Sequence, residues 1–533
     1  MVVWSDCRPD PVGVAPRTVL VTPRGAGASL FSRARSAAVP TVELRERVVV
    51  VGSGFGGGVA ALRLARAGVS ALVLERGTRW PTGPDAQTFP RFVNPDRRAS
   101  WLSPWPVMPL SPPRIFRPYT GMFEKITGSG MTIYCAAAVG GGSVAYHGMT
   151  LQPTQANFAR SMPTAAGDYD ELAAVHYPTV ARMLRVATIP DDLLNTDNYR
   201  SSRLFLEAVD RIGLQPFRVP LPVDWDYARA ELRGQMRSSY TTSDLFYGVN
   251  NGGKHSIDVT YLAAAEATGH IRIAPLHVVR DISLDRQRRW VLDVDRINTR
   301  GVVQEHKRIV TDAVFLAAGS AGTTRLLVKA RAKNLIPDLP EAVGSGWGAN
   351  GDRVWAWTGM HDRPGRVQGG PACVGGRDWD GDLPHTLVHS GTPLRLPNVI
   401  RLMTVIGFGI VPGVGTWSYD PAADDAHLTW PDSGDTALLA KLRTRVDDLT
   451  RTCGGVVGDT NARRKSTWHP LGGVPMGSAV DRVGRVLGHR GLYVLDGARI
   501  PGSTGACNPS MTIAALAEHS MTRIVQHDVG DIF

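Results

Sequence analysis

The chain has 533 residues, enough for about three domains at roughly 150 residues each, which excludes a single small binding module. Its 43% hydrophobic and 20% charged residues are typical of a globular protein and exclude collagen-like, disordered and coiled-coil classes. The net charge of +11 is spread along the chain rather than gathered in one stripe, so we expect no nucleic-acid partner. The 58 glycines indicate many tight turns and close backbone approaches.

Residues 1–45 are rich in Pro, Arg, Ser and Ala without periodicity, and we expect a flexible N-terminal arm. They contain neither a twin-arginine pair nor the continuous apolar stretch of a signal peptide. The longest apolar run, residues 405–411, is too short to span a membrane. We therefore expect a cytoplasmic protein without an integral membrane segment, with export by an atypical leader left open. Five scattered cysteines without Cys-x-x-Cys spacing indicate a reduced interior and no metal site.

A β-α-β unit is predicted where order begins, at Glu46. Residues 48–51, all valine, are typical of a buried parallel strand, and residues 60–67 of a helix. A second apolar run at 71–74 ends in Glu75, which closes the unit. The sequence Gly-Ser-Gly-Phe-Gly-Gly-Gly at 52–58 joins the first strand to the helix. This arrangement predicts a dinucleotide-binding turn rather than a glycine-rich turn without a ligand.

The glycines of this turn have separate physical duties. Gly52 permits the tight turn, Gly54 lets backbone N–H groups approach a pyrophosphate, and Gly57 lets the helix and strand pack closely. The N-terminus of the predicted helix faces the phosphate charge. Glu75 lies where an acid accepts a hydrogen bond from a ribose hydroxyl.

The remainder of the chain distinguishes FAD from NAD. A second glycine cluster follows at 139–143, and only backbone fits against a flat or charged ligand there. Strands are predicted at 271–274 and 278–280, at 290–294 and 308–311 as an alternating pair, at 313–317 before a helix that starts near Thr323, and at 492–495 before a helix over 508–521. A dinucleotide fold whose last strand and helix come from the extreme C-terminus is characteristic of flavoproteins.

These motifs resemble the glucose-methanol-choline (GMC) flavin oxidoreductases, and within them most the bacterial cholesterol oxidases with non-covalent FAD. The resemblance extends over residues 46–528. It rests on seven segments in order beyond the first glycine motif, at 139–143, 260–265, 318–327, 343–351, 419–430, 468–473 and 496–509.

The resemblance implies an α/β fold with a Rossmann-like FAD-binding domain assembled from discontinuous segments. A second, α+β domain built on a large antiparallel sheet is expected to bind the substrate. The FAD-binding domain is predicted to comprise 46–90, 131–155, 241–352 and 461–533, and the substrate domain 91–130, 156–240 and 353–460. The residues expected at the cofactor are Gly52, Gly54, Phe55, Gly57, Glu75, Gly140, Gly141, Gly142, Ser143, Tyr146, Val279, Gly319, Asp496, Gly497, Asn508, Pro509 and Met511.

Oxidation of an alcohol requires hydride transfer to flavin N5 and removal of the hydroxyl proton by a nearby base. His469, in Trp-His-Pro-Leu-Gly-Gly, is the candidate base, because a neutral imidazole accepts a proton near neutral pH. A hydrogen-bonded core histidine is the alternative interpretation. By the resemblance, Asn508 is the second active-site side chain; by itself it is typical of a helix N-cap before Pro509.

Two departures from the cholesterol oxidases stand out. Those enzymes carry a glutamate that moves a proton when the double bond shifts, whereas this chain has no glutamate between Glu341 and Glu518. His389, near the corresponding position, is either a replacement base or a polar loop residue. Tyr146 stands where those oxidases have an asparagine close to the flavin. The adjacent His147 lies two residues too far from Ser143 for the covalent histidyl flavin of some family members, so we expect non-covalent FAD.

The leading hypothesis is an FAD-dependent oxidoreductase that oxidises a secondary alcohol of a large apolar small molecule, steroid-like or polycyclic. O2 or another electron acceptor would reoxidise the flavin, and substrate uptake by transient contact with a membrane surface is an additional expectation. A second hypothesis is a flavoprotein of the same fold adapted to carbon–carbon dehydrogenation or cyclisation of a natural product. A third is a non-catalytic lipid or steroid carrier that uses FAD structurally.

Overall fold

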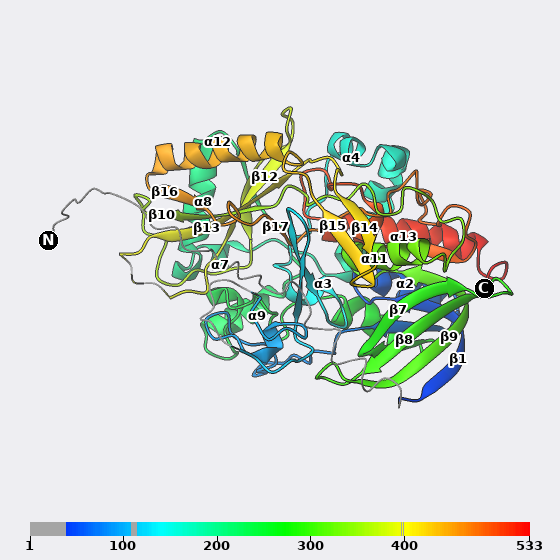
Figure 1. Ribbon diagram of the computed structural model, residues 1–533. Helices are drawn as coiled ribbons and strands as arrows, with labels where there is room; N and C mark the ends of the chain where they lie inside the picture. Colours follow the sequence, from blue (N-terminus) through cyan, green and yellow to red (C-terminus); the bar gives the residue numbers. More distant parts are fainter. Residues whose placement is uncertain (1–38, 108–114, 396, 398) are drawn as a thin grey trace, which may run out of the picture. The chain divides into compact units, whose positions relative to one another are not determined.

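The computed structural model describes residues 39–107, 115–395, 397 and 399–533. The chain divides into residues 1–39 and a compact unit of residues 40–533, shown in Figure 1. Residues 1–38 of the expected flexible arm lie outside the described residues. Residues 41–45 do not belong to an arm, because the first strand, β1, spans Thr41–Val51 and pairs with β9 (Val303–Leu316) along its whole length. The alternation of exposed and half-buried side chains before the valine run explains this longer strand.

A Rossmann-like parallel sheet forms the first half of the unit. Its strand order is β6-β2-β1-β9-β18, with β2 at Ala71–Glu75, β6 at Ile271–Pro275 and β18 at Leu492–Val494. Every neighbouring pair in this path is parallel. All five carboxyl ends therefore meet at one edge, where ligands bind in open α/β sheets.

Strand β9 belongs to two arrangements at once. Residues 314–316 pair with β18, whereas residues 303–311 pair with the antiparallel strand β8 (Trp290–Ile297), which pairs in turn with β7 (His277–Leu284). The alternating strand pair expected from the sequence is therefore present and extends the parallel sheet.

Helices cover this sheet. The helix α2 (Phe55–Arg66) packs against α13 (Ser510–His527), although 444 positions separate Arg66 from Ser510, and α10 (Ala263–Glu266) contacts α2 as well. The helix α11 (Gly319–Ala332) packs against β7. It begins four residues before the expected start at Thr323. The last strand and helix thus come from the C-terminus, as the sequence predicted (Figure 1).

A second sheet of six strands has the order β16-β10-β13-β12-β11-β5, and every pair in it is antiparallel. These strands span Val456–Asp459 (β16), Arg353–Thr358 (β10), Leu402–Gly409 (β13), His385–Ser390 (β12), Val374–Asp378 (β11) and Gln215–Arg218 (β5). One face packs on α8 (Arg200–Arg211) and α12 (Thr436–Cys453) around its own hydrophobic core. This confirms the fold class expected from the sequence.

Smaller elements complete the unit. The strands β3 (Phe123–Thr127), β4 (Thr132–Ala136) and β17 (Ser466–Thr467) form a short sheet, and β14 (Thr416–Asp420) pairs with β15 (Asp425–Thr429). The remaining α-helices in the described part of the chain are α3 (Gly142–Ala145), α4 (Gln155–Ser161), α5 (Tyr169–Glu171), α6 (Tyr177–Met183), α7 (Asp191–Leu194) and α9 (Trp225–Leu232).

Two segments pack differently from the expected division into domains. Residues 156–186 were assigned to the substrate domain, but α6 packs on α13 and its apolar residues join the core of the parallel sheet. The hairpin of β14 and β15 likewise packs on α11 in that core. The reason is that their apolar faces cover helices contributed by distant parts of the chain, which sequence order does not indicate.

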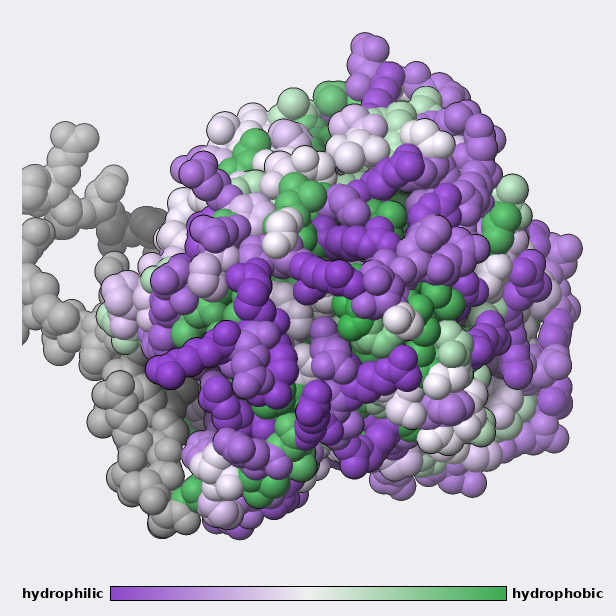
Figure 2. Space-filling view, turned by 90° about the vertical axis from the view of Figure 1, so that its right-hand side faces the viewer, coloured by the Kyte–Doolittle hydropathy of each residue, from purple (hydrophilic) through white to green (hydrophobic). Residues whose placement is uncertain are grey.

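One face of the molecule is mostly polar. Figure 2 shows a face on which hydrophilic residues predominate and hydrophobic residues occur in scattered groups between them. No helix in the described part of the chain is both long enough and apolar enough to cross a membrane.

Candidate functional site

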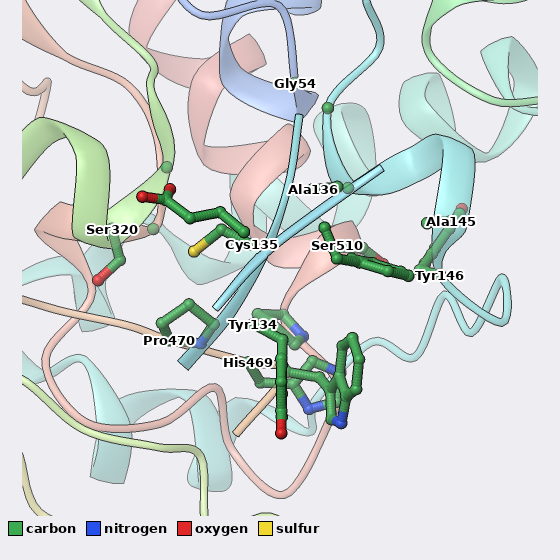
Figure 3. Close-up of a pocket in the computed structure, with 18 of the residues that line it drawn as sticks. Gly54, Tyr134, Cys135, Ala136, Ala145, Tyr146, Ser320, His469, Pro470 and Ser510 are labelled. Carbon is green, nitrogen blue, oxygen red and sulfur yellow. The ribbon is translucent and has the colours of Figure 1, made fainter. Parts of the chain in front are cut away.

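One large cavity, of about 890 Å³, lies among the described residues where the two sheets meet. It extends from the carboxyl ends of the parallel strands, at Gly52 and Glu75, to the open face of the six-stranded sheet, at Thr404 and Ile406. Its volume is typical of a site for a cofactor with a small-molecule substrate. Figure 3 shows part of its lining, with Gly54 near one end and His469 near the other. The wall at the strand ends, with Gly52 and Glu75, is called here the nucleotide wall. The wall at the six-stranded sheet, with Thr404 and Ile406, is called the substrate wall.

Glycines line the nucleotide wall where a side chain would fill the cavity. A Cβ added to Gly142 or Gly319 would have no neighbour within 4 Å, and one added to Gly54 would meet only the Gly141 Cα, at 3.8 Å. Gly52 differs, because its Cβ would lie 2.3 Å from the Ala317 carbonyl oxygen and its φ is +94°. Gly52 therefore serves the turn, and Gly54, Gly142 and Gly319 leave a cradle open.

Ser53 joins this cradle to Glu75. The Ser53 hydroxyl donates to Glu75 Oε2 at 2.6 Å, the Ser53 N–H donates to the same oxygen at 3.1 Å, and the Gly140 N–H donates to Ser53 Oγ at 3.1 Å. Burial raises the pKa of Glu75, while the Ser53 and Gly77 donors oppose that shift. Glu75 thus fixes the geometry of the turn and lines the cavity as well.

Three helices of twelve residues or more begin at the cavity, because Phe55 of α2, Gly319 of α11 and Ser510 of α13 all line it. Asp496 fixes the second of these starts: its Oδ2 accepts the Gly319 N–H at 2.8 Å and the Thr323 hydroxyl at 2.5 Å. Helix N-termini favour anionic groups. Together with the glycine cradle, they fit the phosphates and ring of a dinucleotide.

Most residues expected at the cofactor line this cavity. Those that do are Gly52, Gly54, Phe55, Glu75, Gly141, Gly142, Tyr146, Val279, Gly319, Asp496, Gly497, Asn508 and Pro509. Four lie behind the wall. Gly57 packs under Gly52, since its Cβ would lie 2.1 Å from the Gly52 carbonyl oxygen, Gly140 and Ser143 hold the second glycine turn, and Met511 is buried in α13.

His469 reaches the cavity from the loop after β17 (Figure 3). Its Nδ1 donates to Asp352 Oδ1 at 2.7 Å, while Asp352 Oδ2 accepts the Thr467 hydroxyl at 2.8 Å and the Trp468 N–H at 3.0 Å. A carboxylate at Nδ1 leaves Nε2 as the unprotonated nitrogen and stabilises the imidazolium when Nε2 takes a proton. Sequence reasoning missed Asp352, although it directly follows the Gly351 that ends one of the family segments.

Asn508 lines the cavity, yet its side chain hydrogen-bonds to other residues of the protein. Its Nδ2 donates to the Met149 carbonyl at 2.6 Å and to Ser510 Oγ at 2.8 Å, and its Oδ1 accepts the Leu151 N–H at 3.1 Å. It does not cap α13, because the residue before that helix is Pro509 and no side chain caps it. Both amide hydrogens are used, so Asn508 fixes the loop at 149–151 against the helix start.

His389 does not reach the cavity. It is fully buried on β12, its ring lies 5.6 Å from the ring of Phe205 in α8, and its Nδ1 is 3.1 Å from the Thr404 carbonyl oxygen. Side chains alternate along a strand, and its neighbour Ser390 lines the cavity instead. The expectation that His389 is a replacement base is therefore wrong, and the alternative of a polar loop residue is wrong as well.

Tyr146 lines the cavity beside Phe55, with ring centroids 5.4 Å apart. Its hydroxyl is buried and has no hydrogen-bond partner among the described residues. Behind it, the buried Lys254 donates to the carbonyls of Val144 and Tyr146, at 3.0 Å and 2.6 Å. Burial lowers the pKa of Lys254 to about 7. Lys254 thus holds the turn that presents Tyr146.

Aromatic side chains form much of the cavity lining near His469. Trp468 stacks on Tyr134, with centroids 4.3 Å apart, and meets Phe123 and Phe246 edge-on at 5.2 Å and 5.3 Å. All four line the cavity. Burial raises the pKa of the nearby Cys135 thiol to about 12, so it stays protonated. Of these residues, Trp468 belongs to the motif at 468–473, and the others carried no motif in the sequence. No cluster of three metal-ligating side chains occurs in the described residues.

Two family models match the chain. Residues 433–517 match the model of the GMC oxidoreductase family, and residues 50–108 match that of an NAD(P)-binding Rossmann-like domain. The second match covers the β-α-β unit with the glycine cradle.

Curated proteins and solved structures resemble most of the chain. A cholesterol oxidase of Mycobacterium tuberculosis (strain ATCC 25618 / H37Rv) is 24% identical over 89% of this chain and 90% of that protein. A 6'''-hydroxyparomomycin C oxidase of Streptomyces lividus is 24% identical over 91% of this chain and 92% of its own length. The crystal structure of pyridoxine 4-oxidase from Mesorbium loti shares the fold, with a TM-score of 0.62 and 16% identity over 90% of this chain and 99% of that one.

Proposed function

We propose that this chain, an FAD-dependent oxidoreductase of the GMC type, oxidises a secondary alcohol of a large, predominantly apolar small molecule. The observation that carries the proposal is the pairing of His469 with Asp352 in a cavity that also contains the dinucleotide cradle. A cytoplasmic location and substrate uptake from a membrane surface stay predictions.

Different residues along the cavity would hold different parts of the dinucleotide. The turn at 52–54, Gly142 and the starts of α2 and α11 would hold the dinucleotide, and the start of α13 would lie at its ring. When bound, FAD supplies the acceptor for the hydride that leaves the alcohol carbon.

His469 accepts the hydroxyl proton at Nε2. Asp352 hydrogen-bonds the other nitrogen and stabilises the resulting positive charge, which makes the proton transfer more favourable. The Thr467 hydroxyl and the Trp468 N–H hold Asp352 in this orientation. The surrounding aromatic rings exclude water from the transfer.

The proposed substrate class rests on the cavity lining. Trp468, Phe246 and Phe123 on one side, and Ile406 and Leu402 on the substrate wall, offer apolar contacts to a fused-ring body. The similar proteins include a cholesterol oxidase and a 6'''-hydroxyparomomycin C oxidase. We therefore propose a steroid-like or other polycyclic alcohol.

A second candidate function is carbon–carbon dehydrogenation or cyclisation of a natural product on the same fold. Two observations favour this candidate over a reaction identical to that of the cholesterol oxidases. Tyr146 lines the cavity, and its phenol hydroxyl has no hydrogen-bond partner among the described residues. In the same described part of the chain, no carboxylate of the six-stranded sheet lines the cavity.

The test uses the purified holoprotein. Bound flavin is mixed anaerobically with sterols, polycyclic secondary alcohols and their saturated hydrocarbon analogues, and its absorbance is followed. We expect bleaching by an alcohol and not by its hydrocarbon, and release of intact FAD from acid-precipitated protein. Readmitted O2 or an added dye then identifies the electron acceptor. Bleaching by a substrate without a hydroxyl group would favour the second candidate, and a flavin that no compound bleaches would contradict oxidation.

A further inference from the structure

His147 also lines the cavity, and neither the motif at 468–473 nor the proposed proton transfer uses it. Its Nδ1 lies 3.1 Å from the Ser390 hydroxyl oxygen at the end of β12. Both side chains line the cavity. No residue that the structure describes hydrogen-bonds to His147 Nε2, so this nitrogen is free to meet a ligand.

His147 and His469 have opposite electrostatic surroundings. His469 has the Asp352 carboxylate on its Nδ1, whereas His147 has only a neutral hydroxyl. Burial lowers the pKa of His147 to about 4, and the positive charges of Lys254 and His469 act in the same direction. His147 therefore stays neutral near neutral pH. A neutral imidazole of low pKa suits a hydrogen bond to the substrate rather than removal of its proton.

Strand register places a second hydroxyl beside this pair. Ser390 pairs with Thr404 of β13, and Thr404 pairs with Ala356 of β10, so the three side chains form one row on the same face of the sheet. All three line the cavity. The next row, Val388, Ile406 and Val354, is apolar. The substrate wall thus carries one polar spot within an apolar surface.

Asn508 does not serve a substrate oxygen in this structure, because Met149 and Ser510 use both of its amide hydrogens. A polar spot buried in an apolar wall costs free energy unless a ligand hydrogen-bonds to it. We propose that His147, Ser390 and Thr404 form a subsite that hydrogen-bonds a second oxygen of the substrate, a hydroxyl or ketone oxygen apart from the hydroxyl that His469 deprotonates. This inference rests on the proposed function and narrows its substrate class to alcohols with two oxygen functions.

The experiment compares matched probes in the holoenzyme. Androstanol and decalinol carry one hydroxyl, and androstanediols and decalin diols carry a second one at near and far ring positions. We expect the wild-type enzyme to prefer one of the diols by about tenfold or more in kcat/KM, since a site built to bind a hydroxyl rejects the analogue that lacks it. The preference should lie mainly in KM.

Variants then assign the preference to the subsite. His147→Phe keeps a ring without its nitrogens, Ser390→Ala removes the anchor, and Thr404→Val keeps the shape without the hydroxyl. His147→Phe should remove most of the preference for the diol and leave the mono-alcohol rate within about threefold, and the other two variants should weaken the preference. His389→Phe is the matched control, because that histidine adjoins Ser390 but faces away from the cavity; its selectivity should equal that of the wild type.

The outcomes separate the two proposals. Oxidation of mono-alcohols and diols without any preference, or a preference unchanged in His147→Phe, overturns the subsite and leaves the proposed function standing. An equal loss on both probe types shows that His147 contacts the reacting hydroxyl, which also overturns it. If no alcohol bleaches the flavin, the proposed function fails and the subsite fails with it.

Discussion

The nucleotide wall and the substrate wall border the same cavity but are built in different ways. The nucleotide wall consists of backbone at strand ends and helix starts, where glycines leave room and Ser53, Glu75 and Asp496 fix the turns. The substrate wall consists of alternate side chains from β10, β12 and β13. The comparison shows that the cofactor side depends on backbone geometry, which constrains the sequence strongly. The substrate side depends on individual side chains, so a single substitution can change which substrate is selected.

The largest effect is expected on the nucleotide wall. Gly54→Leu should abolish FAD retention, because the open space in front of Gly54 is the cradle itself. The check is the flavin-to-protein absorbance ratio after purification. Gly83→Leu is the matched control, since an added Cβ there has no neighbour within 4 Å and Gly83 does not line the cavity. A yellow Gly54→Leu protein with full FAD content would refute the assignment.

Removal of the proton acceptor comes next. His469→Ala should slow flavin reduction by about 10²- to 10⁴-fold, the usual cost of a lost general base, with FAD content near that of the wild type. Anaerobic stopped-flow absorbance measures the rate. Unchanged reduction kinetics would exclude His469 from the reaction, and His389→Ala should leave the rate unaltered because that ring lies on the other face of the sheet.

A smaller effect is expected at the residue behind His469. Asp352→Asn removes the negative charge that stabilises the imidazolium and should slow reduction by about 10²-fold, at the low end of the range for a lost base. Anaerobic stopped-flow absorbance measures the rate, and an unchanged rate of flavin reduction would indicate that Asp352 only holds the loop.

Asn508 should show a structural rather than a chemical effect. Asn508→Leu leaves the buried Leu151 N–H without its acceptor, which costs about 1–3 kcal/mol of unfolding free energy. Thermal or urea unfolding measures this loss. If Asn508→Leu instead melts like the wild type while flavin reduction slows strongly, the side chain acts on the reaction directly.

The last prediction concerns a product, the conjugated enone, that we expect not to form. Shifting a double bond after oxidation requires a group that returns a proton to another carbon, and a carboxylate in an apolar pocket suits this. Val388 and Ser390 occupy the strand positions on the cavity side, and His389 points away. If an unsaturated sterol is accepted, we expect the unconjugated ketone, without strong ultraviolet absorbance. Rapid stoichiometric conjugated enone would show that another residue moves the proton.

The sequence by itself determined the nucleotide wall. A valine strand, glycines at fixed spacing and the terminal Glu75 depend on neighbours within about 25 positions. Gly52 and Gly57 meet steric demands of the backbone that no other residue satisfies. His469 could be recognised for a similar reason, because it lies within a contiguous motif. The resemblance to a family also indicated that the last strand and helix would close the parallel sheet.

Only the tertiary structure decided the rest. Asp352 reaches His469 across 117 positions, and His147 reaches Ser390 across 243; neither pairing has a local signature. Whether His389 or Ser390 faces the cavity depends on strand parity, and a shift of one residue reverses the answer. The strand register, which is fixed by packing against α8 and α12, determined which side chain enters the cavity.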